Sequence, residues 1–268
     1  MSESLTWRVP TWVFVVLPAY NEAENLGPLL EEIDLALSEE GLAYTVVLVD
    51  DGSADDTLGV ARGYQGRLTI EIVEHEQNRG LGETIRDGLR YAAAACGPRD
   101  IVIAMDADNT HTPGLIRSMV RLVREGNDVV IASRYQRGAY IRGVPFHRQL
   151  LSLGASWIFR LTFPIRGVRD YTCGYRAYRG TLLQEAFQRF GDDFVEQSGF
   201  QCMVDILLKL REMDVIFAEA PLILRYDKKA GASKMKVFQT VVGTLRLLAK
   251  RRFATRADRR FARTSKGR

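Results

Sequence analysis

The sequence predicts an α/β protein organised around a mostly parallel, doubly wound sheet. Short, continuously apolar runs alternate with amphipathic segments of helical period over the first 135 residues, which is the pattern of repeated strand–helix units. The runs stay apolar throughout because a strand covered by helices on both faces has no solvent side. Acidic and polar clusters follow directly after three of the runs, at the strand ends where such sheets bind ligands.

Five runs of this kind are predicted strands. They are Val13–Leu17, Val46–Val49, Thr69–Val73, Ile101–Met105 and Val129–Ala132. Between them, apolar residues at three- and four-residue steps predict helices over Leu26–Leu37, Gly82–Ala95 and Pro113–Arg124. Asn21 is the expected N-cap of the first helix, and Ser53 with Asp56 has the spacing of a capping box that opens another.

The pattern changes after Tyr135. The segment 134–148 is rich in Arg and Gly and is expected to be a loop. The strongly apolar stretch Leu150–Phe163 has about the length of a core or interfacial helix rather than of a membrane span. Further on, the sequence predicts a helix over Val195–Met213, a strand over Val215–Tyr226 and an amphipathic helix over Val237–Arg252.

Composition places the chain among globular proteins. Of 268 residues, 46% are hydrophobic and 26% charged, which excludes a disordered or collagen-like chain. The three cysteines have no paired spacing, so neither a disulfide framework nor a cysteine zinc site is expected. No apolar run reaches the roughly 18 residues of a membrane-spanning helix, and no secretory leader is expected. We therefore expect a cytoplasmic protein.

The net charge of +4 is unevenly distributed. Residues 246–268 carry ten Lys or Arg and one acid, a charge of +9, which leaves −5 for the other 245 residues. A basic tail of this kind suggests an anionic partner, either lipid headgroups or nucleic acid. Nucleic acid is not the expected partner, because it would leave the acidic clusters unexplained and the tail has few aromatic side chains for stacking.

The strongest chemical signal is the pair Asp106 and Asp108, directly after a predicted strand. Residues two apart in extended chain project to the same side, so both carboxylates can converge on one point beyond the sheet. A hard cation such as Mg²⁺ or Mn²⁺, completed by phosphate oxygens and water, fits such a pair. Solvated turn aspartates are the alternative, and the position at a strand end favours the metal.

Two further clusters are expected at the same edge. Pro18-Ala19-Tyr20-Asn21-Glu22 follows the first strand and Asp50-Asp51-Gly52-Ser53 the second. Carboxylates suit ribose hydroxyls and base N–H groups, and an aromatic ring suits stacking on a base. Taken singly, these residues are good turn and cap formers; their position at one edge indicates a nucleotide.

Together, these motifs resemble those of the family-2 glycosyltransferases, whose fold is the GT-A, or nucleotide-diphospho-sugar transferase, fold. The resemblance is carried by Leu17–Glu22, Val49–Ser53, Asn78–Gly82, Asp106–Asp108 and Ala132–Tyr135. Asp170–Arg176 and Gly231–Met235 are similar to the dolichol-phosphate mannose synthase branch. The resemblance covers about Val13–Met235, so we expect a GT-A domain over 1–235 and an amphipathic helix with a basic tail over 236–268.

The resemblance also implies roles. Asp106 and Asp108 would hold Mg²⁺ or Mn²⁺ on the donor diphosphate, with Asp108 essential, and Arg134, Arg148 and Lys234 would be the catalytic cations around the donor and acceptor phosphates. Donor contacts would come from Pro18, Tyr20, Asn21, Glu22, Asp50, Asp51, Ala107 and Lys228. The chain departs from the branch in two places: Asn109-Thr110 follows the aspartates, so a metal ligand from Thr110 is doubtful, and Lys228 replaces the usual arginine.

The chemistry of a phosphate acceptor agrees with this branch. A phosphate monoester is largely dianionic at neutral pH and needs no general base, whereas it does need positive charge, which the many arginines after residue 133 supply. The sequence thus predicts inverting transfer of mannose or glucose from a nucleotide sugar to a polyprenyl or dolichyl phosphate at the cytoplasmic face of a membrane. One alternative is a hydroxyl acceptor with Asp192, Asp193 or Glu196 as base. A weaker one is a non-catalytic nucleotide-fold protein that binds nucleic acid through its tail.

Overall fold

A seven-stranded sheet forms the centre of the molecule. The structure, a computed structural model, describes residues 11–144, 146–199 and 201–228. Its strands are β1 (Trp12–Ala19), β2 (Ala43–Asp50), β3 (Ile70–Glu74), β4 (Ile101–Ala104), β5 (Val129–Ser133), β7 (Arg176–Arg179) and β8 (Phe217–Pro221). They lie in the order β3-β2-β1-β4-β7-β5-β8. Two short strands, β6 (Tyr140–Arg142) and β9 (Ile223–Arg225), pair outside this sheet.

Every strand pairing in the large sheet is parallel except those made by β7. β7 runs antiparallel to both of its neighbours, β4 and β5. The predicted mostly parallel sheet is therefore confirmed, although β7 itself was not predicted from the sequence. The five predicted strands match β1 to β5 with small shifts at their ends.

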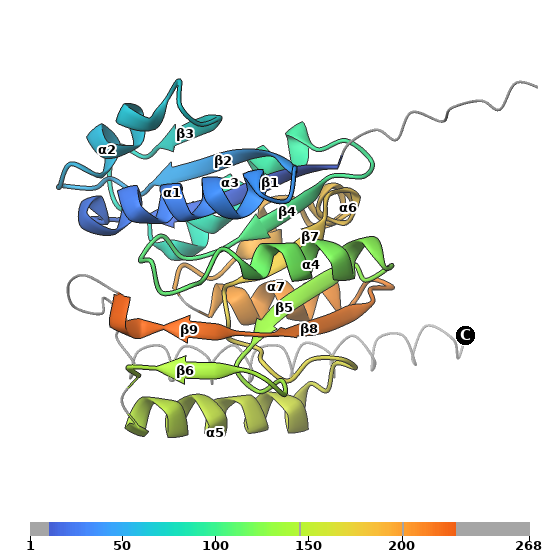
Figure 1. The fold of residues 1–268 in the computed structure, drawn as a ribbon. Coiled ribbons are helices and arrows are strands. Elements are labelled where there is room, and N and C mark those ends of the chain that lie inside the picture. The colour runs from blue at the N-terminus through green and yellow to red at the C-terminus, as the bar shows by residue number, and fades with distance from the viewer. Residues whose placement is uncertain (1–10, 145, 200, 229–268) are drawn as a thin grey trace, which may run out of the picture.

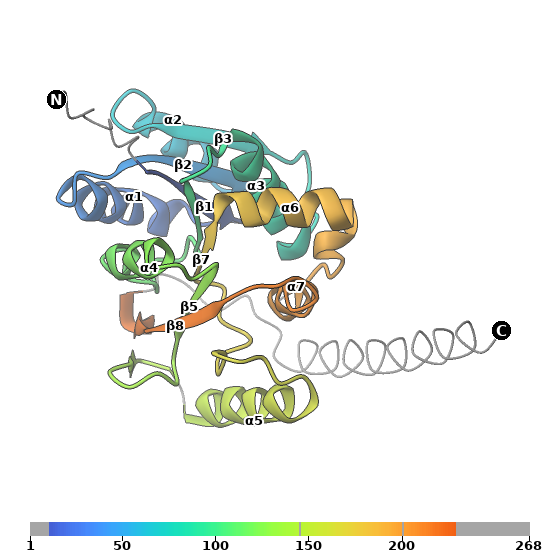
Figure 2. The same cartoon turned by 90° about the vertical axis from the view of Figure 1, so that its right-hand side faces the viewer.

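Helices cover both faces of the sheet. They are α1 (Ala23–Ser38), α2 (Thr57–Tyr64), α3 (Leu81–Ala95), α4 (Leu115–Arg124), α5 (Phe146–Thr162), α6 (Gly180–Phe190) and α7 (Cys202–Leu210), with 3₁₀ turns η1 (Gly191–Val195) and η2 (Tyr226–Lys228). Helices α1 and α4 lie on one face and α3, α6 and α7 on the other (Figure 2). Helix α5 lies apart from both layers, beside β6 (Figure 1). No helix in the described ranges is long and apolar enough to cross a membrane.

The core lies between the sheet and its helices. The hydrophobic residues of β4 and β5 are all buried, and so are those of β2 from Val46 onward. This burial explains why these runs carry no polar alternation. Helix α3 packs closely on the sheet at Gly88, where a Cβ atom would lie 2.5 Å from Cγ1 of Val16. The glycine is required by this close approach.

Several local predictions were wrong. Helix α1 begins after Glu22, and Asn21 instead accepts the N–H of Ala54 through its side-chain oxygen (2.7 Å). Helix α2 begins at Thr57, and the hydroxyl of Ser53 donates to Asp50, so the expected capping box does not form. Tertiary contacts between the two loops took these side chains away from the helix ends.

The predictions after Tyr135 were also incomplete. The segment expected to be a loop, 134–148, contains β6 and the first residues of α5. The helix predicted over 195–213 is the shorter α7, and the strand predicted over 215–226 is divided into β8 and β9. Helix α6 was not predicted. The amphipathic helix and tail expected over 236–268 lie outside the described residues, so the two-part division of the chain stays a prediction.

Candidate active site

The predicted metal carboxylates, Asp106 and Asp108, lie on a turn directly after β4. We call this turn, residues 105–110, the metal turn. The backbone N–H of Met105 still donates to Val16, so the turn starts at the edge of the sheet. Asp106 and Asp108 are partly exposed and flank the buried Ala107. Asp108 accepts the hydroxyl of Thr110 (2.7 Å), which gives Thr110 a role in orienting a carboxylate. The structure thus brings the predicted pair to the predicted edge.

His111 contacts Asp106 through both of its ring nitrogens. Nδ1 of His111 accepts the backbone N–H of Asp106 (3.2 Å), and Nε2 lies 3.9 Å from Oδ2 of the same residue. Because Nδ1 is the acceptor, the ring proton belongs on Nε2, facing the carboxylate. The ring is buried and stacks on Tyr175 at 5.0 Å. The structure thus places His111 against Asp106.

The donor set of this turn suits a hard cation. Within the described residues, no group of three His, Cys, Asp or Glu side chains is arranged to hold a metal ion. Two carboxylates are the number with which Mg²⁺ is often held when phosphate oxygens and water complete its shell. Asn109, in left-handed conformation (φ 59°), also has a buried side-chain oxygen that accepts no hydrogen bond in the described structure. The oxygens of this turn therefore fit Mg²⁺ or Mn²⁺.

The segment after β1 lies beside the metal turn. In the parallel register, Ala19 pairs with Asp50 and Val16 with Ala104, so the ends of β1, β2 and β4 meet at one edge. Pro18 is the penultimate residue of β1, and the ring of Tyr20 is 37% exposed, available for stacking. Glu22 is buried and accepts the side-chain amide of Asn25 (2.7 Å). Of these residues, Tyr20 presents the most surface to a ligand.

Asp50 and Asp51 are more buried than the sequence suggested, with 1% and 3% of their surface exposed. Asp50 accepts the backbone N–H and hydroxyl of Ser53. Asp51 accepts the backbone N–H groups of Arg79 (2.8 Å) and Gly80 (2.9 Å). Both carboxylates therefore shape the loops at this edge from within, an arrangement that the sequence motif alone does not reveal.

Arg134, a predicted catalytic cation, is held by a buried carboxylate. Its Nε and Nη2 donate to the two oxygens of Asp170 at 2.7 and 2.6 Å, and Nη2 also donates to Thr172 (2.6 Å). Asp170 is fully buried, whereas 20% of the Arg134 side chain is exposed. Burial alone would raise the pKa of Asp170, but the adjacent Arg134 guanidinium holds it below its ordinary value. The pair is a fixed guanidinium with one open side.

The loop of Asp170 connects this arginine to the metal turn. Further along the same loop, a Cβ atom on Gly174 would lie 3.4 Å from Oδ1 of Asp106. The backbone N–H of Asp170 donates to the carboxylate of Glu219 (2.7 Å) on β8. The structure thus makes Asp170 the partner of Arg134.

Other predicted cations have different fates. Arg176 is fully buried and donates to the backbone carbonyls of Cys173, Met203 and Tyr171, so it is structural. Lys228 pairs with Glu32 on α1. Glu32 lies well beyond the start of that helix, and so away from the sheet edge. Arg148 falls within α5, and Lys234 lies outside the described residues.

Two of the three acids proposed as bases for a hydroxyl acceptor form ion pairs. Asp192 is 76% exposed and pairs with Arg90. Arg90 lies nine residues beyond the start of α3, and therefore about 13 Å along the helix from the end that lies at the sheet edge. Glu196 lies 3.7 Å from Nζ of Lys209, which also holds the buried Asp205. Asp193 is exposed on η1, a turn that packs on α3 and α6.

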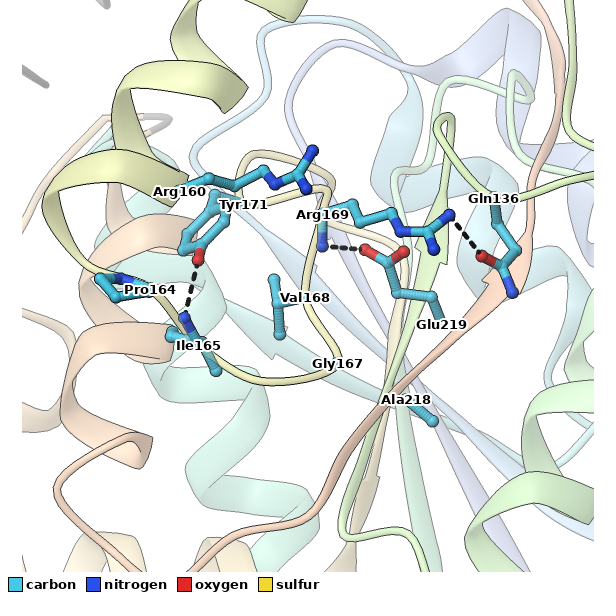
Figure 3. Close-up of a pocket in the computed structure, with 10 residues that line it drawn as sticks. All are labelled: Gln136, Arg160, Pro164, Ile165, Gly167, Val168, Arg169, Tyr171, Ala218 and Glu219. Carbon is cyan, nitrogen blue, oxygen red and sulfur yellow. Dashed lines mark hydrogen bonds between the residues drawn. The ribbon is translucent and has the colours of Figure 1, made fainter.

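A pocket of about 600 Å³ lies between the end of α5 and β8 (Figure 3). Figure 3 shows Arg160 and Arg169 above apolar residues that include Val168 and Ala218. Its Glu219 accepts the backbone N–H groups of Arg169 and Asp170. The pocket therefore shares a wall with the loop that holds Arg134.

Comparison with known proteins identifies the family. The family model described as Glycosyl transferase family 2 matches residues 14–187. The chain belongs to this family. The match includes the edge of β1, β2 and β4, the metal turn and the loop of Asp170, and it ends within α6.

Relatives of this family 2 member include polyprenyl-phosphate enzymes. The chain is 32% identical over 225 residues to a dolichol-phosphate mannosyltransferase of Pyrococcus furiosus, which covers 84% of this chain and 59% of that protein. It is 27% identical over 232 residues to a polyprenol monophosphomannose synthase of Mycolicibacterium smegmatis, covering 86% and 83%. The chain thus spans less than two thirds of the first relative.

Solved structures of similar fold extend the comparison. Glucosyl-3-phosphoglycerate synthase of Mycobacterium tuberculosis, solved in complex with Mn²⁺, uridine diphosphate and phosphoglyceric acid, superposes with a TM-score of 0.62. The identity is 20%, and the match covers 89% of this chain and 76% of that chain. The likeness confirms the GT-A fold predicted from the sequence.

Proposed function

We propose that this chain is an inverting, metal-dependent glycosyltransferase that moves a hexose from a nucleotide sugar to a polyprenyl phosphate. The observation that carries the proposal is the fixed guanidinium of Arg134, joined through the Asp170 loop to the carboxylates of the metal turn. A cation placed beside a diphosphate site suits an acceptor that is itself a phosphate. The two prenyl-phosphate relatives support the same acceptor class.

The donor side is supported by the edge formed by β1, β2 and β4. Tyr20 offers a ring for the base, and the loops shaped by Asp50 and Asp51 border the same edge. Asp106 and Asp108 would hold Mg²⁺ or Mn²⁺. When bound there, the ion would supply positive charge to the leaving diphosphate.

The transfer itself requires positioning more than proton removal. An oxygen of the acceptor phosphate attacks the anomeric carbon, the bond from that carbon to the diphosphate oxygen breaks, and the nucleoside diphosphate leaves with the electron pair. The dianionic acceptor has no proton to lose. Arg134 would orient the acceptor phosphate, with its own geometry fixed by Asp170. This route needs no base.

Helix α5 supports action at a membrane surface. Its side chains Leu153, Trp157, Ile158 and Leu161 are between 42% and 78% exposed. Three of them are spaced four residues apart and so share one side of the helix. The guanidinium of Arg160 lies over the ring of Trp157 (5.1 Å). An apolar face bordered by an arginine suits the interface of an anionic bilayer, where the acceptor lipid would be found.

The experiment that tests the proposal is transfer of labelled sugar into an organic extract. Purified protein is incubated with polyprenyl phosphate, Mg²⁺ and labelled GDP-mannose or UDP-glucose. We expect labelled lipid with the wild type and at least a hundredfold less with Asp108→Asn, because the substitution removes a charge from the cation site. The Asp214→Asn variant, an exposed acid outside the site, is the control.

Two outcomes would contradict the proposal. Undiminished transfer by the Asp108→Asn variant, or in excess chelator, would remove the metal from the reaction. Label that appears only on water-soluble hydroxyl acceptors would favour the alternative acceptor class.

A further inference from the structure

His75 is a buried histidine to which the transfer reaction as described gives no role. It follows β3, and only 3% of its side chain is exposed. Its backbone N–H continues the sheet by donating to Asp50 (2.9 Å). The ring therefore lies at the same edge of the sheet as the loops after β1 and β2.

Both ring nitrogens of His75 face carboxylates. Nδ1 lies 2.8 Å from Oδ1 of Asp51, and Nε2 lies 3.1 Å from Oδ2 of Asp87 on α3. Behind Asp87, Nε of Arg86 approaches Oδ1 at 3.3 Å. His75 thus lies between the end of β2 and helix α3, with one ring nitrogen within hydrogen-bond distance of a carboxylate on each side.

Asp51 transmits this contact to the backbone. One of its oxygens accepts both His75 and the N–H of Arg79, and the other accepts the N–H of Gly80. Three of about four acceptor positions of the carboxylate are then used within the protein. The loop is also tightly packed, since a Cβ on Gly52 would lie 2.5 Å from the backbone of Gln77. The loop before α3 consequently depends on where Asp51 is held.

We propose that His75 is a positioning residue of the donor site, which holds Asp51 and, through it, the backbone at Arg79 and Gly80 in the shape that receives the nucleotide. This rests on the proposed function, which takes the edge of β1 and β2 as the nucleotide site. The contact with Asp51 is the important one, and the contact with Asp87 anchors the ring to α3. Loss of the Nδ1 donor would therefore weaken nucleotide binding.

The test uses two amides that each replace one ring nitrogen. An asparagine nitrogen is as many bonds from Cβ as Nδ1, and a glutamine nitrogen as many as Nε2. His75→Asn keeps a donor toward Asp51, His75→Gln keeps one toward Asp87, and His75→Leu keeps neither. Binding of UDP and of GDP in Mg²⁺ is measured by calorimetry for each variant, together with Tm and with KM and kcat for the donor.

We expect His75→Asn to bind the preferred nucleotide within about threefold of the wild type. His75→Gln and His75→Leu should bind about tenfold more weakly, the effect of one lost charge-assisted hydrogen bond, with KM raised and kcat at saturation retained. Equal affinity of the Asn and Gln variants, whether both near wild type or both weakened, would overturn the proposal, since a role in packing alone would not distinguish the two nitrogens. If the Leu variant fails to fold, the Asn and Gln comparison still decides.

Nucleotide binding by the wild-type protein distinguishes a failure of this inference from a failure of the proposed function. A wild-type protein that binds neither UDP nor GDP would count against the donor site itself. A wild type that binds a nucleotide, with unchanged binding in all three variants, would reject the role of His75 alone.

Discussion

At the residue scale, burial decides what each charged side chain can do. Arg134 and Arg176 both belong to the arginine-rich part of the sequence after residue 133. Arg176 is fully buried and donates to three backbone carbonyls, whereas Arg134 retains an exposed part beside Asp170. A guanidinium that is held on one side and open on the other can bind a phosphate with little loss of conformational freedom. The usefulness of Arg134 therefore depends on Asp170.

Asp170→Asn should destabilise the protein and slow transfer. The substitution leaves the buried side of the Arg134 guanidinium without its charge partner, for which about 3–5 kcal/mol is typical. The pKa of Asp170 is lowered by Arg134, so the contribution of the pair is present above the ordinary carboxyl pKa, about 3.9, and is lost as the pH falls through the lower folded value. Urea unfolding should therefore show a difference from wild type that is largest at pH 7 and smaller at pH 3.

The matched control for this prediction is Asp227→Asn. Asp227 accepts two hydrogen bonds from Arg225 at 2.9 Å, so the pairing geometry resembles that of Asp170. This pair is at the surface, where water screens the charges, and its loss should cost little. A difference for Asp170→Asn that is the same at both pH values would contradict the assigned charge interaction.

At the element scale, the positions of two helices are set by different constraints. The start of α3 approaches the segment after η1 so closely that a Cβ on Gly82 would lie 1.8 Å from the carbonyl oxygen of Gln197. The Gly80-Leu81-Gly82 sequence is therefore explained by packing and by the positive φ of Gly80 (91°). Helix α5, by contrast, buries Phe159 but leaves Leu153, Trp157, Ile158 and Leu161 exposed.

Replacing the exposed apolar residues of α5 should weaken binding to vesicles. Trp157→Ser and Leu161→Ser each remove a large side chain that would enter the interface, and we expect about a tenfold lower partition coefficient per substitution from the lost burial. Sedimentation with vesicles that contain anionic lipid measures this. Ile216→Ser is the control, because Ile216 is 59% exposed but lies before β8. Equal losses in all three variants would contradict a specific role for α5.

At the scale of the whole molecule, charge is separated along the chain. The last 23 residues carry +9 and the rest −5, so the pI of 9.0 reflects the tail more than the catalytic part. The tail lies outside the described residues, and its role is argued from charge alone. An anionic surface attracts each basic residue by roughly 1 kcal/mol at low salt.

Deletion of residues 251–268 should weaken binding to anionic vesicles in a salt-dependent way. The difference between the full chain and the truncated chain should be large at low salt and disappear near 1 M salt, where the Debye length is about 3 Å. Neutral vesicles, on which both chains should bind alike, are the control. Unchanged binding at low salt would show that α5, and not the tail, meets the membrane.

Much of the site follows from local patterns. Buried parallel strands are readable because they are continuously apolar, and Asp106 and Asp108 are recognisable because they follow one of these runs. The antiparallel strand β7 was missed because its sequence, Arg176–Arg179, contains two arginines. A central strand can hold these charges only because each arginine finds partners in the folded protein. His75 was missed for a similar reason: its two carboxylates are 24 and 12 residues away.

The sequence by itself determined the fold class and the family and predicted the sheet edge proposed for the chemistry, because these depend on the order of apolar runs and on motifs of a few adjacent residues. Only the tertiary structure decided which charges act on a ligand and which act on the protein. Asp51, Asp170 and Arg176 became supports because they have partners in distant segments. Long-range pairing in a region of low dielectric fixes the role of a charged side chain, and no local pattern encodes it.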